Sequence, residues 1–169
     1  MWYVVRCHDG AEEKIIHSCK QHLARNVLDD AFVFTYERMK KKLGQWHTET
    51  LQMFPDYVFL ETEHEEELSE GLKPYQSIVE ILADSDALLR VNPEEEAFLK
   101  YLCGKNHHLS MSRGYIRNGI THVVEGPLKG MENRIRKIDR HKRIARIEAP
   151  IHYTKAESIL AGLEIVEKN

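Results

Sequence analysis

The sequence predicts an α+β fold in two domains, in which an antiparallel sheet with flanking helices precedes a small β-barrel of about five strands. Three observations carry this prediction. The first hundred residues show strand and helix patterns in the order β-α-β-β-α-β-α, and residues 123–149 show strand, turn, strand, turn, strand. Residues 1–103 hold 11 Lys and Arg against 20 Asp and Glu, whereas residues 104–169 hold 13 against 7. An acidic part joined to a basic part indicates two domains with different partners.

The elements of the acidic part follow from local patterns. Aromatic and β-branched runs predict strands over residues 2–7, 31–39, 46–50, 53–60 and 77–82. Apolar residues at helical spacing, or strong capping signals, predict helices over residues 12–23, 61–72 and 92–102. Asn92 is the expected cap of the last helix, with Pro93 at its first position. The basic segment from Arg38 to Gly44, which contains Lys40, Lys41 and Lys42, is expected to form a hairpin tip, either solvated or in contact with nucleic acid.

The basic part begins after a polar segment without periodicity, residues 104–114, which we interpret as a linker. Val123 and Val124 end at the turn chemistry of Gly126-Pro127, with Gly130 close behind. Isoleucines then alternate with Lys and Arg in two further strands around a polar turn at residues 139–142. Closing strands are expected over residues 151–153 and 163–166. Because apolar residues are few, each strand should bury one face and leave the other in water.

The wet face of these strands is strongly basic. Seven of the thirteen residues from Arg134 to Arg146 are Lys or Arg, and one, Asp139, is acidic. Such a face fits the phosphate backbone of a nucleic acid, although an ordinary solvated surface is the alternative. The candidate binding residues are Lys129, Arg134, Arg136, Lys137, Arg140, His141, Lys142, Arg143 and Arg146.

Cysteine usage and the N-terminus bear on the compartment. Cys7, Cys19 and Cys103 are odd in number and form no C-x-x-C motif, so we expect free thiols in a reducing cytoplasm. The chain starts directly with strand-forming residues at Trp2-Tyr3-Val4-Val5, without the charged segment of a signal peptide. No apolar run approaches the roughly 20 residues that a membrane span needs. The expectation is a cytoplasmic protein that does not enter membranes.

Three motifs, in order along the chain, give it a family resemblance. Trp2-Tyr3-Val4-Val5 resembles the opening strand of the NusG family of transcription elongation factors. Residues Phe54 to Phe59 resemble the family's F-P-G-Y-V-hydrophobic signature, and Gly126-Pro127-Leu128 onward resembles its KOW motif. Asn133 stands where the family usually has a second glycine, and Asn tolerates a positive φ there.

The resemblance implies a fold and two binding functions. Residues 1–103 would form a NusG-type (NGN) domain that docks on the clamp helices of RNA polymerase, and residues 115–169 an SH3-like KOW barrel. The docking candidates are Val4, Arg6, Phe54, Tyr57 and Phe59. Their alternative role is plain core. Arg6 falls where one paralogue has an aromatic residue, so that contact is expected to differ.

Within the family the chain looks most like LoaP-type antiterminators, whose KOW domain binds RNA. The basic run is heavy, and Leu128 replaces the Phe with which the housekeeping type contacts a termination factor or ribosomal protein. The expected function is therefore antitermination or processive elongation, with an RNA hairpin bound by the barrel. Two alternatives stay open: a housekeeping NusG-like factor whose barrel binds a ribosomal or termination protein, and a ribosome-associated or RNA-processing KOW protein.

The sequence offers little for metal or catalytic chemistry. Ten histidines are present, but no Cys joins them at ligand spacing, and His17 and His22 miss the i, i+4 spacing. Phosphate-binding loops, the G-x-S-x-G motif and a convincing nucleophile–base pair are all missing. We therefore expect a monomeric, non-enzymatic protein without a cofactor, a metal ion or catalytic residues.

Overall fold

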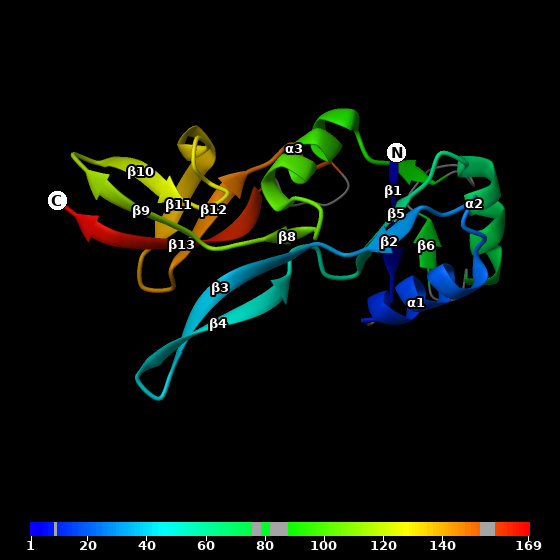
Figure 1. The fold of residues 1–169 in the computed structure, drawn as a ribbon, viewed down its shortest axis with the longest axis horizontal. Coiled ribbons are helices and arrows are strands. Elements are labelled where there is room, and N and C mark those ends of the chain that lie inside the picture. The colour runs from blue at the N-terminus through cyan, green and yellow to red at the C-terminus, as the bar shows by residue number, and fades with distance from the viewer. Residues whose placement is uncertain (9, 76–78, 82–87, 153–157) are drawn as a thin grey trace. The chain divides into compact units, whose positions relative to one another are not determined.

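The computed structural model describes residues 1–8, 10–75, 79–81, 88–152 and 158–169, with the side chains of 79–81 left aside. The fold mixes α and β structure in two compact units (Figure 1). The N-terminal unit comprises residues 1–33 and 54–96, and the C-terminal unit comprises residues 34–53 and 97–169. The segment 34–53, which was predicted to belong to the first domain, thus groups with the C-terminal residues.

The N-terminal unit is built on an antiparallel sheet in the order β2-β5-β1-β6, with β7 also paired to β1. Its strands are β1 (Trp2–Cys7), β2 (Asp30–Phe32), β5 (Tyr57–Glu61), β6 (Val79–Ile81) and β7 (Leu89–Arg90). The strand predicted over residues 2–7 is confirmed, and it is central because aromatic and β-branched side chains are buried on both of its faces. The predicted strand 77–82 is confirmed at 79–81, and its remaining residues lie outside the described ones.

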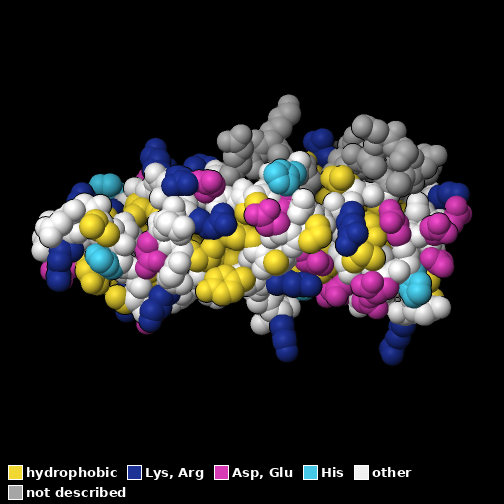
Figure 2. All heavy atoms as spheres, turned by 90° about the horizontal axis from the view of Figure 1, so that it is seen from above, with side chains coloured by type: hydrophobic (Ala, Val, Ile, Leu, Met, Phe, Trp, Pro, Cys, Tyr) yellow, Lys and Arg dark blue, Asp and Glu magenta, His cyan; other side chains and the backbone are white. Residues whose placement is uncertain are grey.

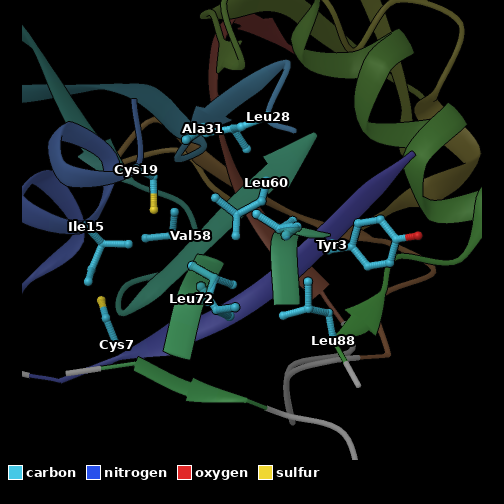
Figure 3. Close-up of a cluster of buried hydrophobic side chains, with 12 residues drawn as sticks. Tyr3, Cys7, Ile15, Cys19, Leu28, Ala31, Val58, Leu60, Leu72 and Leu88 are labelled. Carbon is cyan, nitrogen blue, oxygen red and sulfur yellow. The ribbon is translucent and has the colours of Figure 1, made fainter. Parts of the chain in front are cut away.

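Helices α1 (Glu12–His22) and α2 (Glu65–Leu72) cover one face of this sheet (Figure 1). Alternate residues of β1, namely Tyr3, Val5 and Cys7, point to that face. They pack with Ile15 and Cys19 of α1 into a core that Figure 3 shows. Because alternation is strict in a strand, the other side chains of β1 must lie on the opposite face. The second predicted helix was placed too early, since residues 57–61 belong to β5.

Helix α3 (Pro93–Cys103) begins as the sequence predicts. The Oδ1 atom of Asn92 accepts a hydrogen bond from the backbone N–H of Glu94 at 2.9 Å, which satisfies one of the unpaired donors of the first turn. Glu94, Glu95 and Glu96 place negative charge at the positive end of the helix dipole.

A long hairpin opens the C-terminal unit. Strands β3 (Thr35–Lys42) and β4 (Gln45–Gln52) pair antiparallel over their whole length, and β8 (His108–Leu109) pairs parallel to β3. The turn consists of Leu43 and Gly44, both with positive φ (49° and 77°), as a tight hairpin requires. The predicted tip at residues 38–44 was therefore too wide, because the lysines before Leu43 belong to β3.

The main sheet of the C-terminal unit has the order β10-β9-β13-β12-β11 (Figure 1). Its strands are β9 (Ser112–Arg117), β10 (Ile120–Glu125), β11 (Ile135–Asp139), β12 (Ile144–Glu148) and β13 (Ser158–Lys168). Strand β13 pairs antiparallel with β12 and parallel with β9, so it joins two hairpins into one sheet. Alternate residues of β12 and β13, including Ala145, Ile147, Ile159 and Leu163, are buried.

Three other predictions in this region were wrong. The segment 104–114 is not a plain linker, because it contains β8 and the beginning of β9. The strand expected over 31–39 is broken at Val33 and Phe34 into β2 and β3. Ile151 and His152 form no strand, and the third residue expected there lies outside the described part of the chain. The separate binding functions assigned to residues 1–103 and 115–169 stay predictions.

Candidate nucleic-acid interface

The predicted basic residues come together on β11, β12 and the segments beside them. Lys129 lies in the turn after β10, and Arg134 ends the 3-10 turn η2 (Glu132–Arg134) before β11. The others lie on the two strands or in the turn that joins them. Figure 2 shows Lys and Arg side chains standing among exposed apolar side chains on one face of the C-terminal unit.

Two of the predicted arginines are engaged within the C-terminal unit. The guanidinium of Arg134 lies over the ring of Phe98, with 4.9 Å between its central carbon and the ring centroid. Arg136 forms an ion pair with Glu148 and donates a hydrogen bond to the backbone carbonyl of Asn133 at 3.1 Å. These contacts hold both side chains within the C-terminal unit. Both arginines therefore contribute to the structure of this unit before any ligand binds.

Arg143 is the most constrained member of the predicted set. Its guanidinium lies 3.8 Å from the ring centroid of Trp46, and its Nη1 atom is 3.2 Å from Glu164 Oε1 and 3.4 Å from Met39 Sδ. Its φ of 53° is in the left-handed region, which a turn after β11 requires. Arg143 therefore holds the β3–β4 hairpin against the sheet. Local sequence does not reveal this role, because Trp46 lies far away in the chain.

Three other members surround a small hollow of about 180 Å³. Lys137, Lys142 and Arg146 line it together with Asp139. Lys137 and Arg146 are register partners in the antiparallel pair, so their side chains leave the sheet on the same face. Arg146 also donates to Ser158 Oγ at 3.1 Å. The backbone N–H of Lys142, which donates to Asp139 Oδ1 at 3.0 Å, lowers the pKa of that carboxyl. Asp139 thus orders the turn that presents Lys142.

The remaining predicted residues, Lys129, Arg140 and His141, are exposed. Like Lys137 and Lys142, Lys129 and Arg140 form no ion pair with a carboxylate in the described parts of the chain. Their charges are therefore available to an anionic ligand. The structure thus divides the predicted set into cations already used inside the unit and cations open to solvent.

The turn between β10 and β11 explains the glycines of the KOW-like motif. Gly126 and Gly130 have positive φ (98° and 83°), and a Cβ on Gly126 would lie 2.6 Å from the backbone of Ser112. The hydroxyl of Ser112 accepts a hydrogen bond from the N–H of Leu128 at 3.0 Å. Asn133 does not adopt the positive φ expected of it, because it lies inside η2. Leu128 is fully buried, so it presents no side chain to a partner.

The predicted docking residues share one face of the N-terminal sheet. Val4 is the register partner of Phe59, and Arg6 is the partner of Tyr57. Phe54 lies beside Phe59, with 5.9 Å between ring centroids. Val4, Phe59 and Phe54 are buried, whereas Tyr57 is half-buried and Arg6 is exposed. The two residues within direct reach of a partner are therefore Arg6 and Tyr57.

Two further aromatic residues belong to this face and were not predicted. The ring of Trp2 lies edge-on to Phe32 at 5.2 Å, and Phe32 stacks on Phe59 at 5.8 Å. Trp2 also donates from Nε1 to Glu61 Oε2 at 3.2 Å. Alternation along β1 could have placed Trp2 with Val4, but the pairing of β2 with β5 that adds Phe32 is not visible in local sequence.

The turn before β5 is held by a buried carboxylate. Glu12 is 3% exposed, and its Oε1 atom accepts a hydrogen bond from the backbone N–H of Asp56 at 2.7 Å. Asp56 has a φ of 71°, which glycine adopts at no steric cost. This geometry gives a physical reason for the glycine of the F-P-G-Y-V signature, and it shows how an Asp is accommodated in its place.

A comparison with protein families adds independent evidence. The family model described as "Transcription termination factor nusG" matches residues 1–99, which is more than half of the chain. The chain belongs to the NusG family. The match covers β1, the aromatic face and the Asp56 turn of this NusG-family chain. No curated protein matches the sequence.

Membership indicates a transcription elongation or termination factor, and the family as a whole interacts with RNA polymerase. Among the helices that the structure describes, none combines the length and the apolar character of a membrane span. The described residues also hold no group of three or more His, Cys, Asp or Glu arranged to bind a metal ion. The three cysteines are free, in agreement with the predicted free thiols, and all three are buried.

Proposed function

We propose that this NusG-family chain is an antitermination or processive elongation factor of the LoaP type. Its N-terminal unit docks on the clamp helices of RNA polymerase, and its C-terminal sheet, a KOW-type SH3-like barrel, binds an RNA hairpin. It works by binding two partners and catalyses no reaction. The RNA contact rests on the C-terminal basic residues, and the polymerase contact on the aromatic face of the N-terminal sheet.

The observation that carries the RNA proposal is the grouping of Lys137, Lys142 and Arg146 around one hollow. Two of these cations are direct cross-strand partners, and like charges placed opposite each other destabilise a sheet. Asp139, in the same lining, offsets part of that repulsion. A phosphate group seated among the three cations would offset the rest, and Arg in particular suits phosphate geometry.

The burial of Leu128 argues against a protein contact made through this residue. A protein interface usually centres on an apolar or aromatic anchor that projects from the surface. Leu128 is fully buried and cannot serve as that anchor. RNA is also the nucleic acid that emerges beside a polymerase-bound factor, and its hairpins are read through phosphates, 2′-hydroxyls and loop bases.

For polymerase docking, the reachable side chains are Arg6 and Tyr57, directly opposite each other on β1 and β5. A helix lying across this face would meet an amphipathic ring next to a cation. Such helix-in-groove contacts draw most of their energy from a few anchors. Phe59 and Phe54 support Tyr57 from below, since the two rings pack together inside the unit.

The test is binding of leader-RNA hairpins by the full chain, measured by fluorescence anisotropy across a range of salt concentrations. If three to five phosphates are contacted, log affinity should fall against log salt with a slope of about −2 to −4. A triple variant, Lys137→Gln, Lys142→Gln and Arg146→Gln, should weaken binding and flatten the slope by about 2. The matched control replaces Lys14, Lys105 and Lys168, which are exposed outside the cluster, with Gln.

Equal losses in the two triple variants would contradict the assignment, because a general charge effect would then account for the binding. Specificity is tested separately with competitor RNA, since phosphate contacts position a protein without reading sequence. If every hairpin tried were displaced wholly by competitor, the housekeeping alternative, with a protein partner for the sheet, would be the better interpretation.

A further inference from the structure

A second, larger hollow also has Lys137 in its lining. It has a volume of about 540 Å³ and is bordered by residues of β10, β11 and η2. Strands β10 and β11 are the two end strands of the sheet order, so each has a neighbour on one side only within that order. The hollow is therefore bordered by residues of the two end strands.

The lining of this hollow is chemically mixed. Ile120, Ile135 and Ile138 supply apolar surface, and the side chain of Ile120 is 61% exposed. Thr121 and Asn133 supply a hydroxyl and an amide, which can each donate and accept hydrogen bonds. The carboxylate in the lining, Glu132, is held by a hydrogen bond from the N–H of Val123 at 3.1 Å.

Lys137 lines both hollows, which makes it the link between them. Its ammonium group can reach one phosphate of an RNA strand. The next phosphates of that RNA strand would then lie toward Lys142 and Arg146. Arg136 also borders the larger hollow, where its contact with the carbonyl of Asn133 fixes its position. The lining thus combines apolar surface, hydrogen-bonding side chains and a cation. These groups match a ligand that has an aromatic ring, hydrogen-bonding edges and an attached phosphate.

A protein strand is a poor match for the same hollow. Addition of a strand to β11 would need a regular edge, but the β11–β12 register shifts between Ile135 and Lys137. A bulge and consecutive charged residues at an edge both oppose strand addition. Arg136 and Lys137 provide those charges.

We propose that the hollow between β10 and β11 holds one unpaired nucleotide of the bound RNA, with the phosphate of that nucleotide on Lys137. The base lies on the isoleucine side chains and its edge faces Thr121 and Asn133. This inference rests on the proposed RNA-binding function and adds to it a means of distinguishing a hairpin with a loop or bulge from a plain duplex. Unpaired bases are the part of RNA that proteins read most directly.

The experiment uses the full chain and two RNA probes with the same stem, one fully paired and one with a single bulged 2-aminopurine nucleotide. Anisotropy should show a preference of roughly tenfold for the bulged probe, as one or two hydrogen bonds to the edge of the base would give. The 2-aminopurine fluorescence should change on binding. In Asn133→Ala and Thr121→Val the preference should fall toward equality, while affinity for the paired stem and its salt dependence stay the same.

Asn106→Ala and Thr48→Val are the matched controls, because both residues are exposed in the C-terminal unit and lie outside the lining. Circular dichroism should show that all four variants fold. Binding of both probes with equal affinity would overturn the inference and leave the proposed function intact. Failure to bind either probe would refute the proposed function itself. An unchanged preference in Asn133→Ala and Thr121→Val would also overturn the inference, because the preference would then arise outside this hollow.

Discussion

Lys137 lies directly opposite Arg146 in the antiparallel pair of β11 and β12, on the face where both side chains border one hollow. Folding alone does not favour two cations in this position. Their cost in stability is small, on the order of 0.2–1 kcal/mol, so a functional gain can outweigh it. Substitutions in this pair can therefore distinguish an effect on RNA affinity from an effect on stability.

Lys137→Gln should reduce RNA affinity without reducing stability. We expect roughly fivefold weaker hairpin binding at low salt and a salt slope closer to zero by about 1. The midpoint of urea unfolding should stay the same or rise slightly, because repulsion with Arg146 is removed. Anisotropy and urea titration measure the two effects, with Lys14→Gln as the control. A clear fall in the urea midpoint would mean that Lys137 supports the sheet instead.

Arg143→Gln should give the opposite result. Loss of the contacts with Trp46 and Glu164 should destabilise the C-terminal unit by about 1–2 kcal/mol, as expected for a partly desolvated cation–π contact. The salt slope of RNA binding should not change. Trp46 fluorescence reports the loss of the contact directly. A flattened slope with unchanged stability would return Arg143 to the RNA-binding set.

Glu12→Ala should destabilise the N-terminal unit by about 1–3 kcal/mol, because it leaves the N–H of Asp56 without its buried acceptor. Glu12→Gln keeps an acceptor oxygen and should lose less. In contrast, Asp56→Gly should be neutral or stabilising, by up to about 1 kcal/mol, because glycine accepts a φ of 71° without strain. Thermal unfolding of the three variants checks the order, and equal losses in all three would contradict the account of this turn.

Polymerase docking should depend on Tyr57 and Arg6. Tyr57→Ala combined with Arg6→Glu should abolish co-purification with RNA polymerase while RNA binding persists. Phe59→Ala is a poor test, because removal of a fully buried ring costs about 3–5 kcal/mol and would weaken the fold itself. The double variant must retain its circular dichroism spectrum. Normal co-purification of the folded double variant would exclude this face as the docking site.

The buried thiols should make the chain sensitive to alkaline pH. Burial raises the pKa of Cys7 and of Cys19 from the ordinary value of 9.0 to about 11. Their contribution to stability is fully present below about pH 9 and is lost as pH rises toward 11, because the unfolded chain gives up its protons first. Cys19→Ala should reduce this loss in urea titrations at pH 8 and pH 10.5. An unchanged pH dependence would place the effect elsewhere.

How far the sequence could predict the molecule depended on whether a signal was local. Strand β1, the start of α3 at Asn92 and the β11–β12 hairpin were predicted because each depends on neighbouring residues. Strand β9 was missed because Ser112 to Arg117 pairs with β10 on one side and distant β13 on the other, and its polar residues hide the alternation.

The candidate site shows the same limit. The basic composition predicted that residues 134–146 would face a nucleic acid, and that function stays a prediction. Composition could not tell which cations are available. Arg134 and Arg143 look equivalent to Lys137 in the sequence, but their partners Phe98 and Trp46 come from distant segments. Long-range packing decided the difference.

The position of β13 also governs how the C-terminal sheet can be assembled during synthesis. It is the last of the five strands to leave the ribosome, although it occupies the middle of the strand order. Until it emerges, the β9–β10 and β11–β12 hairpins can form only as separate, marginally stable pairs with open edges. A nascent chain paused before Ser158 would therefore lack a finished RNA-binding surface. Synthesis of β13 would thus determine when that surface first becomes available.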